Sequence, residues 1–198
     1  MRPKSLVKEE AIRRVALRII SEEGLENLSM QKLAKEANIS PRTIYLKYVN
    51  KEDLLVKLFI EEVLGVYEAA VLENFAETMD FAAGMKRLWT NGFHYFKKNR
   101  PSFVLMQYGS SSPLLNKAYQ EKNIQEGDFF SPIHRWLQRH VASGAIRDFP
   151  HEVHRALLFS PIINLVGEYF DYVERPVQII TDELVLECCE TVIRGMVR

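Results

Sequence analysis

The chain has 198 residues, of which 47% are hydrophobic and 26% charged, and its formal net charge is zero. This composition is typical of an ordinary globular protein. Charges interrupt the apolar runs well short of the roughly 18–20 residues that span a bilayer, and the first residues lack an apolar signal core. The two cysteines, Cys188 and Cys189, are adjacent and build no disulfide framework. We therefore expect a cytoplasmic protein with no membrane partner.

The zero net charge hides an asymmetry along the chain. Residues 1–51 contain 11 Lys+Arg against 6 Asp+Glu, whereas residues 52–198 contain 15 against 20. A basic first quarter on an acidic remainder indicates that one end meets a polyanion. Chance variation over a solvated surface is the alternative that charge alone leaves open.

The hydrophobic period is helical almost throughout. One buried helical face comes first, formed by Ile12, Val15, Ala16, Ile19 and Ile20. Gly24 then supplies a helix stop.

The next helices are short and have clear end signals. Ser29 can cap a second helix, which Asn38 ends because Asn tolerates the left-handed conformation. Ser40 caps a third helix, with Pro41 at its first position, where the missing N–H is harmless. Asn50 caps a fourth helix, which has two acidic residues in its first turn.

The rest of the chain predicts longer helices and no sustained strand alternation. We expect them near residues 51–77, 80–99, 101–108, 113–125, 129–143, 150–173 and 182–197. Pro161 predicts a kink or a break in the helix over residues 150–173, near Leu157 to Ser160.

Two short helices joined by the three-residue turn over residues 38–40 form a helix-turn-helix. In such a motif the second helix presents its N-terminal residues to base edges in the major groove. Arg42 can pair with guanine, the methyl group of Thr43 can contact thymine, and Ile44 would face the small core. Hydroxyl groups and lysines typically hold phosphates, a role that fits Ser29, Lys47, Tyr48 and Lys51.

The run "AIRRVALRIISEEGLENLSMQKLAKEANISPRTIYLKYVNKEDLLVKLF", residues 11–59, resembles the N-terminal domain of TetR-family transcriptional regulators. Two positions depart from the common pattern: Asn38 replaces a glycine, and Lys47 stands where histidine is frequent. The resemblance implies that the DNA contacts are Ser29, Arg42, Thr43, Tyr45, Lys47, Tyr48 and Lys51. A small helical subdomain with solvated basic residues is the competing interpretation.

The resemblance also implies an all-α protein in two parts. We expect a three-helix DNA-binding domain over residues 1–51, with the helix-turn-helix at about 28–47. Residues 52–198 would form a larger helical domain for effector binding and dimerisation.

Two apolar helices near the C-terminus predict a homodimer packed as a four-helix bundle. The helix over residues 156–170 is apolar nearly all round, and the last helix carries a clean apolar stripe. The expected interface residues are Ile162, Val166, Val185, Cys189, Val192 and Met196. Full burial of these helices within one chain is the alternative.

The larger domain is rich in aromatic and Met side chains, which suits a small apolar or aromatic effector. The candidate pocket residues are Trp89, Phe93, Met106, Tyr108 and Trp136. Each of them could equally be ordinary core.

No catalytic residue, metal site or cofactor is predicted. His151 and His154 have the spacing that could begin a metal site, but no further ligand is near in sequence, and exposed or cap-adjacent histidines are the simpler interpretation. We therefore predict a repressor that a small molecule releases from a pseudo-palindromic double-stranded DNA operator. An activator, a ligand-independent repressor, and a ligand carrier or enzyme on the same fold are the alternatives.

Overall fold

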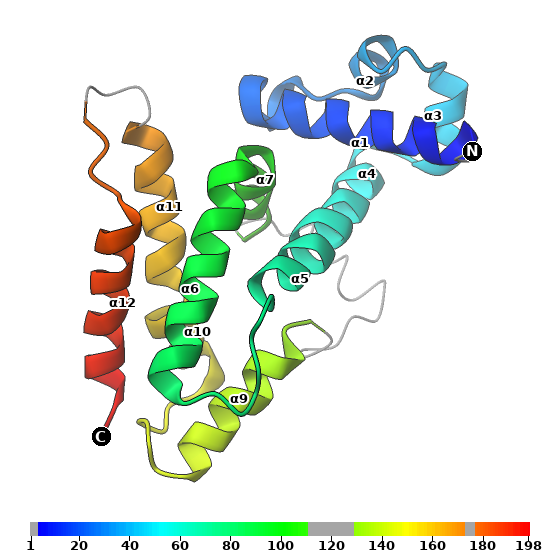
Figure 1. Ribbon diagram of the computed structural model, residues 1–198. Coiled ribbons are helices and arrows are strands. Elements are labelled where there is room, and N and C mark those ends of the chain that lie inside the picture. The colour runs from blue at the N-terminus through cyan, green and yellow to red at the C-terminus, as the bar shows by residue number, and fades with distance from the viewer. Residues whose placement is uncertain (1–3, 111–128, 173–176) are drawn as a thin grey trace. The chain divides into compact units, whose positions relative to one another are not determined.

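The computed structural model describes residues 4–110, 129–172 and 177–198 (Figure 1). Every regular element in these ranges is a helix, as expected, and none of these helices is long and apolar enough to cross a membrane. The described residues fall into two compact units. The first lies within Met1–Val66 and Asn99–Gln125, and the second within Tyr67–Lys98 and Glu126–Arg198. The helix expected over residues 113–125 lies outside the described residues.

The first unit contains the short helices that the sequence predicted. Its elements are α1 (Lys4–Glu23), a 3₁₀ turn (Leu25–Asn27), α2 (Met30–Glu36), α3 (Pro41–Lys47), α4 (Lys51–Leu58), a π-helix (Phe59–Val66) and α7 (Arg100–Ser110). The predicted buried face of α1 is confirmed, since Ile12, Ala16, Ile19 and Ile20 are almost fully inaccessible. Helix α1 packs against α2 and α7, and α2 packs against α3.

The helix expected over residues 51–77 differs from the prediction in two ways. It changes from α to π geometry at Phe59, and its last α-helical segment, α5 (Tyr67–Val71), ends six residues early. A turn follows, with Asn74 in the left-handed region at φ 55°. The π-helix carries Glu62, which is 8% exposed and pairs with Arg13 of α1 at 3.1 Å. Burial raises the pKa of Glu62, and Arg13 opposes that shift.

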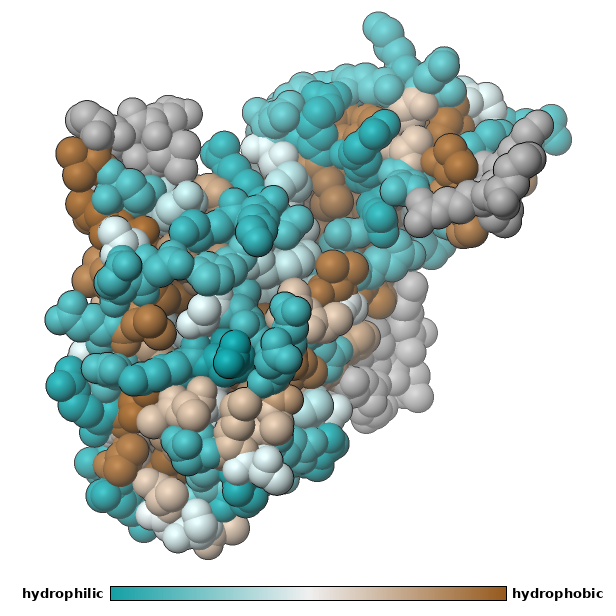
Figure 2. All heavy atoms as spheres, viewed as in Figure 1, coloured by the Kyte–Doolittle hydropathy of each residue, from teal (hydrophilic) through white to brown (hydrophobic). Residues whose placement is uncertain are grey.

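The second unit is arranged around one central helix. Its elements are α5, α6 (Phe81–Lys98), α9 (Ser131–Ala142), α10 (His151–Leu158), α11 (Ser160–Tyr172) and α12 (Asp182–Met196). Helix α6 contacts α5, α11 and α12, and α11 and α12 can be seen beside it in Figure 1. Over the visible face of the molecule, hydrophobic residues are scattered among hydrophilic ones (Figure 2).

Helix α6 and helix α9 approach each other closely at Gly84. A methyl group added at Gly84 would come within 2.4 Å of the Trp136 ring, so only glycine fits against this indole. Trp136 also stacks on Phe81, with the ring centres 5.3 Å apart. This contact holds α9 against α6.

The predicted break at Pro161 is confirmed. Helix α10 ends at Leu158, and α11 begins at Ser160, one residue before the proline. The break lies where the proline ring would clash with the carbonyl group four residues earlier, at Leu157.

Candidate nucleic-acid interface

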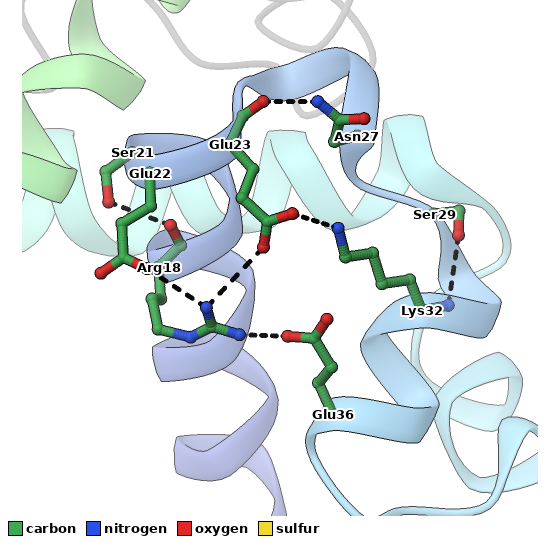
Figure 3. Close-up of polar contacts among 8 residues, drawn as sticks. All are labelled: Arg18, Ser21, Glu22, Glu23, Asn27, Ser29, Lys32 and Glu36. Carbon is green, nitrogen blue, oxygen red and sulfur yellow. Dashed lines mark hydrogen bonds and ion pairs between the residues drawn. The ribbon is translucent and has the colours of Figure 1, made fainter.

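An ion-pair network on the surface of the first unit holds α2 against α1 (Figure 3). The Arg18 guanidinium reaches Glu22, Glu23 and Glu36, while Lys32 of α2 pairs with Glu23 of α1. Exposed pairs of this kind contribute little singly, and more when several charges share one network. The network fixes the helix that precedes the turn.

The turn between α2 and α3 has the geometry that the sequence predicts. Asn38 has φ 53°, in the left-handed region, and the Ile39 N–H donates to the carbonyl of Ala34 at 3.0 Å. Ser40 caps α3 by accepting from the Thr43 N–H at 3.2 Å, and Pro41 follows it as the first helical residue. These bonds set where α3 begins and therefore which side chains it turns outward.

Helix α3 has one buried and one open side. Ile44 is fully buried, as predicted, and anchors the helix. Arg42 is exposed and Tyr45 is 50% exposed. Within the described part of the chain, neither side chain forms a hydrogen bond or an ion pair. Both groups are therefore available to a partner molecule.

The hydroxyl-bearing residues at the two helix starts are exposed or half-buried but already engaged. Ser29 caps α2 by accepting from the Lys32 N–H at 3.1 Å. The Thr43 hydroxyl lies 2.8 Å from the Ser40 hydroxyl. A hydroxyl group has two acceptor lone pairs and one donor. Ser29 and Thr43 therefore keep some bonding capacity while they hold the helix ends in place.

Tyr48 does not belong to this open surface. It is 2% exposed, and the Nζ atoms of Lys47 and Lys57 lie 5.7 and 5.2 Å from the centre of its ring. Burial, with a further contribution from Glu61, raises the pKa of Tyr48 to about 12. This burial leaves Tyr48 almost no open surface for the expected phosphate contact. Together with Ile44, four residues earlier, Tyr48 forms the inner face of the motif.

The two predicted lysine contacts are partly occupied inside the protein. Lys47 pairs with Glu9 of α1, so its charge is balanced locally. Lys51 donates to the Leu25 carbonyl at 2.7 Å, which ties the start of α4 to the turn before α2. A carbonyl group does not neutralise an ammonium group, and two of the three N–H donors of Lys51 remain. Lys51 thus keeps its charge at the edge of the motif.

Asn50 and Asp53 set the start of α4 by two hydrogen bonds from backbone N–H groups to their side chains. Asn50 Oδ1 accepts from the Asp53 N–H at 2.8 Å, and Asp53 Oδ2 accepts from the Val49 N–H at 3.0 Å. Lys57 pairs with Asp53 at 2.8 Å and donates to the Lys47 carbonyl at 2.9 Å. The sequence analysis missed Lys57, although its spacing of four residues from Asp53 is a recognisable signal.

The candidate pocket residues are divided between the two units. Trp89, Phe93 and Trp136 belong to the second unit and are almost fully buried, whereas Met106 and Tyr108 belong to α7 in the first unit. The indole N–H of Trp89 donates to the Leu158 carbonyl at 2.8 Å, and that of Trp136 to the Met79 carbonyl at 3.0 Å. The two indoles are therefore satisfied core groups.

A surface hollow of about 580 Å³ lies elsewhere in the second unit, between α9 and α10. Leu137, Val141 and Phe149 line it together with His134 and His151, whose ring centres are 4.5 Å apart. None of the five predicted pocket residues lines it. Its lining combines apolar surface with groups that can form hydrogen bonds.

Most of the expected dimer residues face the interior of a single chain. Ile162, Val166, Val185, Cys189 and Met196 are each at most 4% exposed. Helices α11 and α12, which carry them, pack against α6. Within the single chain these five residues are already covered, because the apolar stripe of α12 packs on α6, and their place in an interface stays a prediction. Of the predicted set, Val192 alone is half-exposed.

The histidine His154 and the cysteine Cys189 both lie in the core of the described residues. Among the described residues, no group of three or more His, Cys, Asp or Glu side chains is placed to hold a metal ion. His154 is buried, and its Nε2 lies 2.9 Å from the Arg147 carbonyl. Burial raises the pKa of the Cys189 thiol to about 12, so this buried thiol stays protonated at neutral pH.

Three comparisons identify the class of protein. A family model described as bacterial regulatory proteins, tetR family, matches residues 12–58. An HTH-type transcriptional regulator of Haemophilus influenzae is 39% identical over 95 residues, which cover 47% of this chain and 50% of that protein. The fatty acid metabolism regulator protein of Bacillus subtilis is 42% identical over 62 residues, 31% of each chain. The aligned segments thus span half or less of these curated relatives.

Solved structures match over the full length. A TetR family transcription regulator from Marinobacter aquaeolei gives a TM-score of 0.84 at 23% identity, over 100% of this chain and 99% of that one. A TetR-family transcriptional regulator from Haemophilus influenzae gives 0.76 at 25% identity, over 100% of both. The fold and the α2–α3 motif define a helix-turn-helix protein of the bacterial regulator class. Residues 12–58 match the family model of TetR regulators, and the whole chain has the fold of TetR-family regulators.

Proposed function

We propose that the chain is a repressor that binds a pseudo-palindromic DNA operator as a homodimer and is released by a small molecule. One observation carries the proposal. The short helix α3 is anchored by a buried Ile44 and turns Arg42 and Tyr45 outward, where both are unpaired within the described residues. Arg42 supplies a bidentate donor for guanine.

The phosphate contacts lie beside α3 in this proposal. Lys51 keeps its charge, and Ser29 is exposed at the start of α2. Lys47 contributes after giving up its ion pair with Glu9, which two partly exposed groups exchange at little cost. Such contacts set the register of a protein on DNA and make binding depend on salt.

The homodimer would bring two copies of α3 to successive major grooves, about 34–36 Å apart. Since the stripe of α12 is buried, we assign the interface to the neighbouring side of this helix. Leu184, Cys188 and Val192 lie there and are half-buried in the single chain. They follow the i, i+4, i+8 pattern of one helical side.

Sedimentation velocity tests the assignment. Val192→Glu would place a charge in the interface, and we expect monomers at concentrations where the wild type is a dimer. Glu187→Lys is the control, because Glu187 is exposed on another side of α12. Intact dimers of the Val192→Glu protein would remove this side from the interface.

We assign the effector to the hollow between α9 and α10. Its volume of about 580 Å³ is in the range that small ligands occupy, about 300–1,000 Å³. Leu137, Val141 and Phe149 would bury an apolar or aromatic ligand, and His134 and His151 would orient it. A ligand that favours a different spacing of the two α3 helices would weaken DNA binding, with a coupling of about 1–3 kcal/mol.

Operator selection from random duplexes, repeated with candidate ligands, tests the function as a whole. We expect enrichment of a palindromic site and loss of binding with an apolar or aromatic effector. Ala142→Trp, at an exposed position that lines the hollow, should abolish the ligand response and leave operator binding intact. Enrichment of no site would refute the proposal. A site that no ligand affects would favour a ligand-independent regulator.

A further inference from the structure

Helix α3 carries an apolar surface that its expected DNA contacts do not account for. Leu46 is 80% exposed and Val49, just after the helix, is 77% exposed. These are the two most exposed large hydrophobic side chains in the part of the chain that the structure describes. A single exposed aliphatic side chain needs no explanation, but two neighbouring ones on a recognition helix do.

The exposed residues lie on one side of the helix and just past its end. Arg42, Tyr45 and Leu46 follow the i, i+3, i+4 spacing of one helical side, Val49 lies two residues after the last helical residue, and all four are exposed. This spacing usually marks a buried face, yet here the buried residues are Ile44 and Tyr48. The outward stripe therefore combines one cation, one phenol and two aliphatic groups.

The surroundings of the stripe favour DNA as its partner. The stripe is continuous with the proposed DNA surface, because Arg42 and Tyr45 belong to both. Residues 1–51 also carry 11 Lys+Arg against 6 Asp+Glu, a balance that suits a polyanion. The inference rests on the proposed function.

Leucine has no donor or acceptor, so it can distinguish bases only through an apolar group on their edges. In the major groove the apolar group that the bases present is the C5 methyl of thymine. We propose that Leu46 reads a thymine methyl group in each operator half-site, beside the base that Arg42 contacts. Val49 covers the neighbouring sugar or methyl surface.

Replacing single thymines of the selected operator by uracil tests this inference, because uracil lacks the methyl group and keeps the hydrogen-bonding edge of thymine. We expect one thymine per half-site whose replacement weakens wild-type binding about fourfold, the factor that one buried methyl group gives. Replacement in both half-sites should weaken it about 16-fold. The remaining thymines should show little change.

Leu46→Ala links the effect to the residue. The variant should bind the thymine operator more weakly and no longer distinguish thymine from uracil at that position. Val177→Ala is the control, since Val177 is an aliphatic residue of the second unit with 66% exposure. It should keep the full uracil effect. Both variants should unfold at the wild-type temperature, because neither side chain is buried.

The outcomes separate this inference from the proposed function. If no duplex is bound in a salt-sensitive manner, the proposed function fails and this inference fails with it. If the operator is bound but uracil has no effect, or has the same effect on Leu46→Ala, Leu46 does not read thymine and the function stands. If Leu46→Ala is a monomer at concentrations where wild type is a dimer, and still shows the uracil effect, the stripe contacts a protein chain and not DNA.

Discussion

Helix α3 and the core around α6 both carry aromatic side chains, but they use them differently. On α3, Tyr45 is half exposed and its hydroxyl is unbonded within the described residues. Around α6, Trp89 and Trp136 are fully buried, and each indole N–H already donates to a backbone carbonyl. An aromatic residue is thus available for recognition where its neighbours leave it uncovered and its polar atom unpaired.

Removing Trp136 should produce the largest change. Trp136→Ala leaves a cavity beside Phe81 and Gly84, and we expect a loss of about 3–5 kcal/mol in the free energy of unfolding. Urea unfolding followed by circular dichroism measures it. A loss below about 1 kcal/mol would mean that the site is loosely packed and could admit a ligand, which would weaken the contrast with α3.

Removing Arg42 should weaken DNA binding and leave the stability of the fold almost unchanged. Arg42→Ala should lower operator affinity by about 5- to 150-fold for each half-site, because the homodimer loses one bidentate base contact of about 1–3 kcal/mol in each. The free energy of unfolding should stay within about 0.5 kcal/mol, because the side chain is exposed. Arg87→Ala is the matched control, since Arg87 is exposed in the second unit. Equal affinities of the two variants would contradict the assignment of Arg42.

Two glycines allow a tightly packed position to be compared with an open one. Gly84→Ala forces a methyl group against Trp136, and we expect a loss of about 1–3 kcal/mol in stability. At Gly65 an added methyl group meets only the Ile60 carbonyl, at an ordinary 3.5 Å. Gly65→Ala should therefore be neutral or stabilising by up to about 1 kcal/mol. Thermal unfolding of both variants makes the comparison, and equal effects would show that the α6–α9 contact can relax.

The smallest expected effect is a pH dependence that arises from the same core. His140 packs against Phe81 and Trp136, and burial lowers its pKa in the folded protein. The unfolded chain therefore binds a proton at His140 more readily than the folded protein does. The buried neutral ring stabilises the fold above about pH 6.5, and this contribution is lost as the pH falls. Wild type should lose up to about 1 kcal/mol more than His140→Gln between pH 7.5 and 5.5. If the stability of the two proteins fell by the same amount over this pH range, burial of the His140 ring would be contradicted.

The helix ends and the turn were predictable from the sequence because local chemistry decides them. Ser29, Ser40 and Asn50 cap the helices that follow them, and Asn38 takes the left-handed conformation of the turn. The break at Pro161 likewise follows from the proline ring alone. Each of these features depends on a few neighbouring residues.

The features that the sequence could not decide depend on packing between distant parts of the chain. The stripe of α12 is apolar at helical spacing, but the sequence could not tell whether α6 or a second copy covers it. Tyr48 was expected to hold a phosphate, but residue 48 lies just past the end of α3, where its side chain turns into the core. The π-helix at residues 59–66 leaves no signal in the hydrophobic period.

The most direct test of the central claim, that α3 reads DNA, is an anisotropy titration of the selected operator and a scrambled duplex. Salt would be varied between about 50 and 200 mM, with wild type and Tyr45→Ala compared. We predict salt-dependent binding in which wild type prefers the operator by about 10³-fold or more, and in which Tyr45→Ala loses much of that preference. Equal binding of both duplexes by wild type, or an unchanged preference in Tyr45→Ala, would contradict the account.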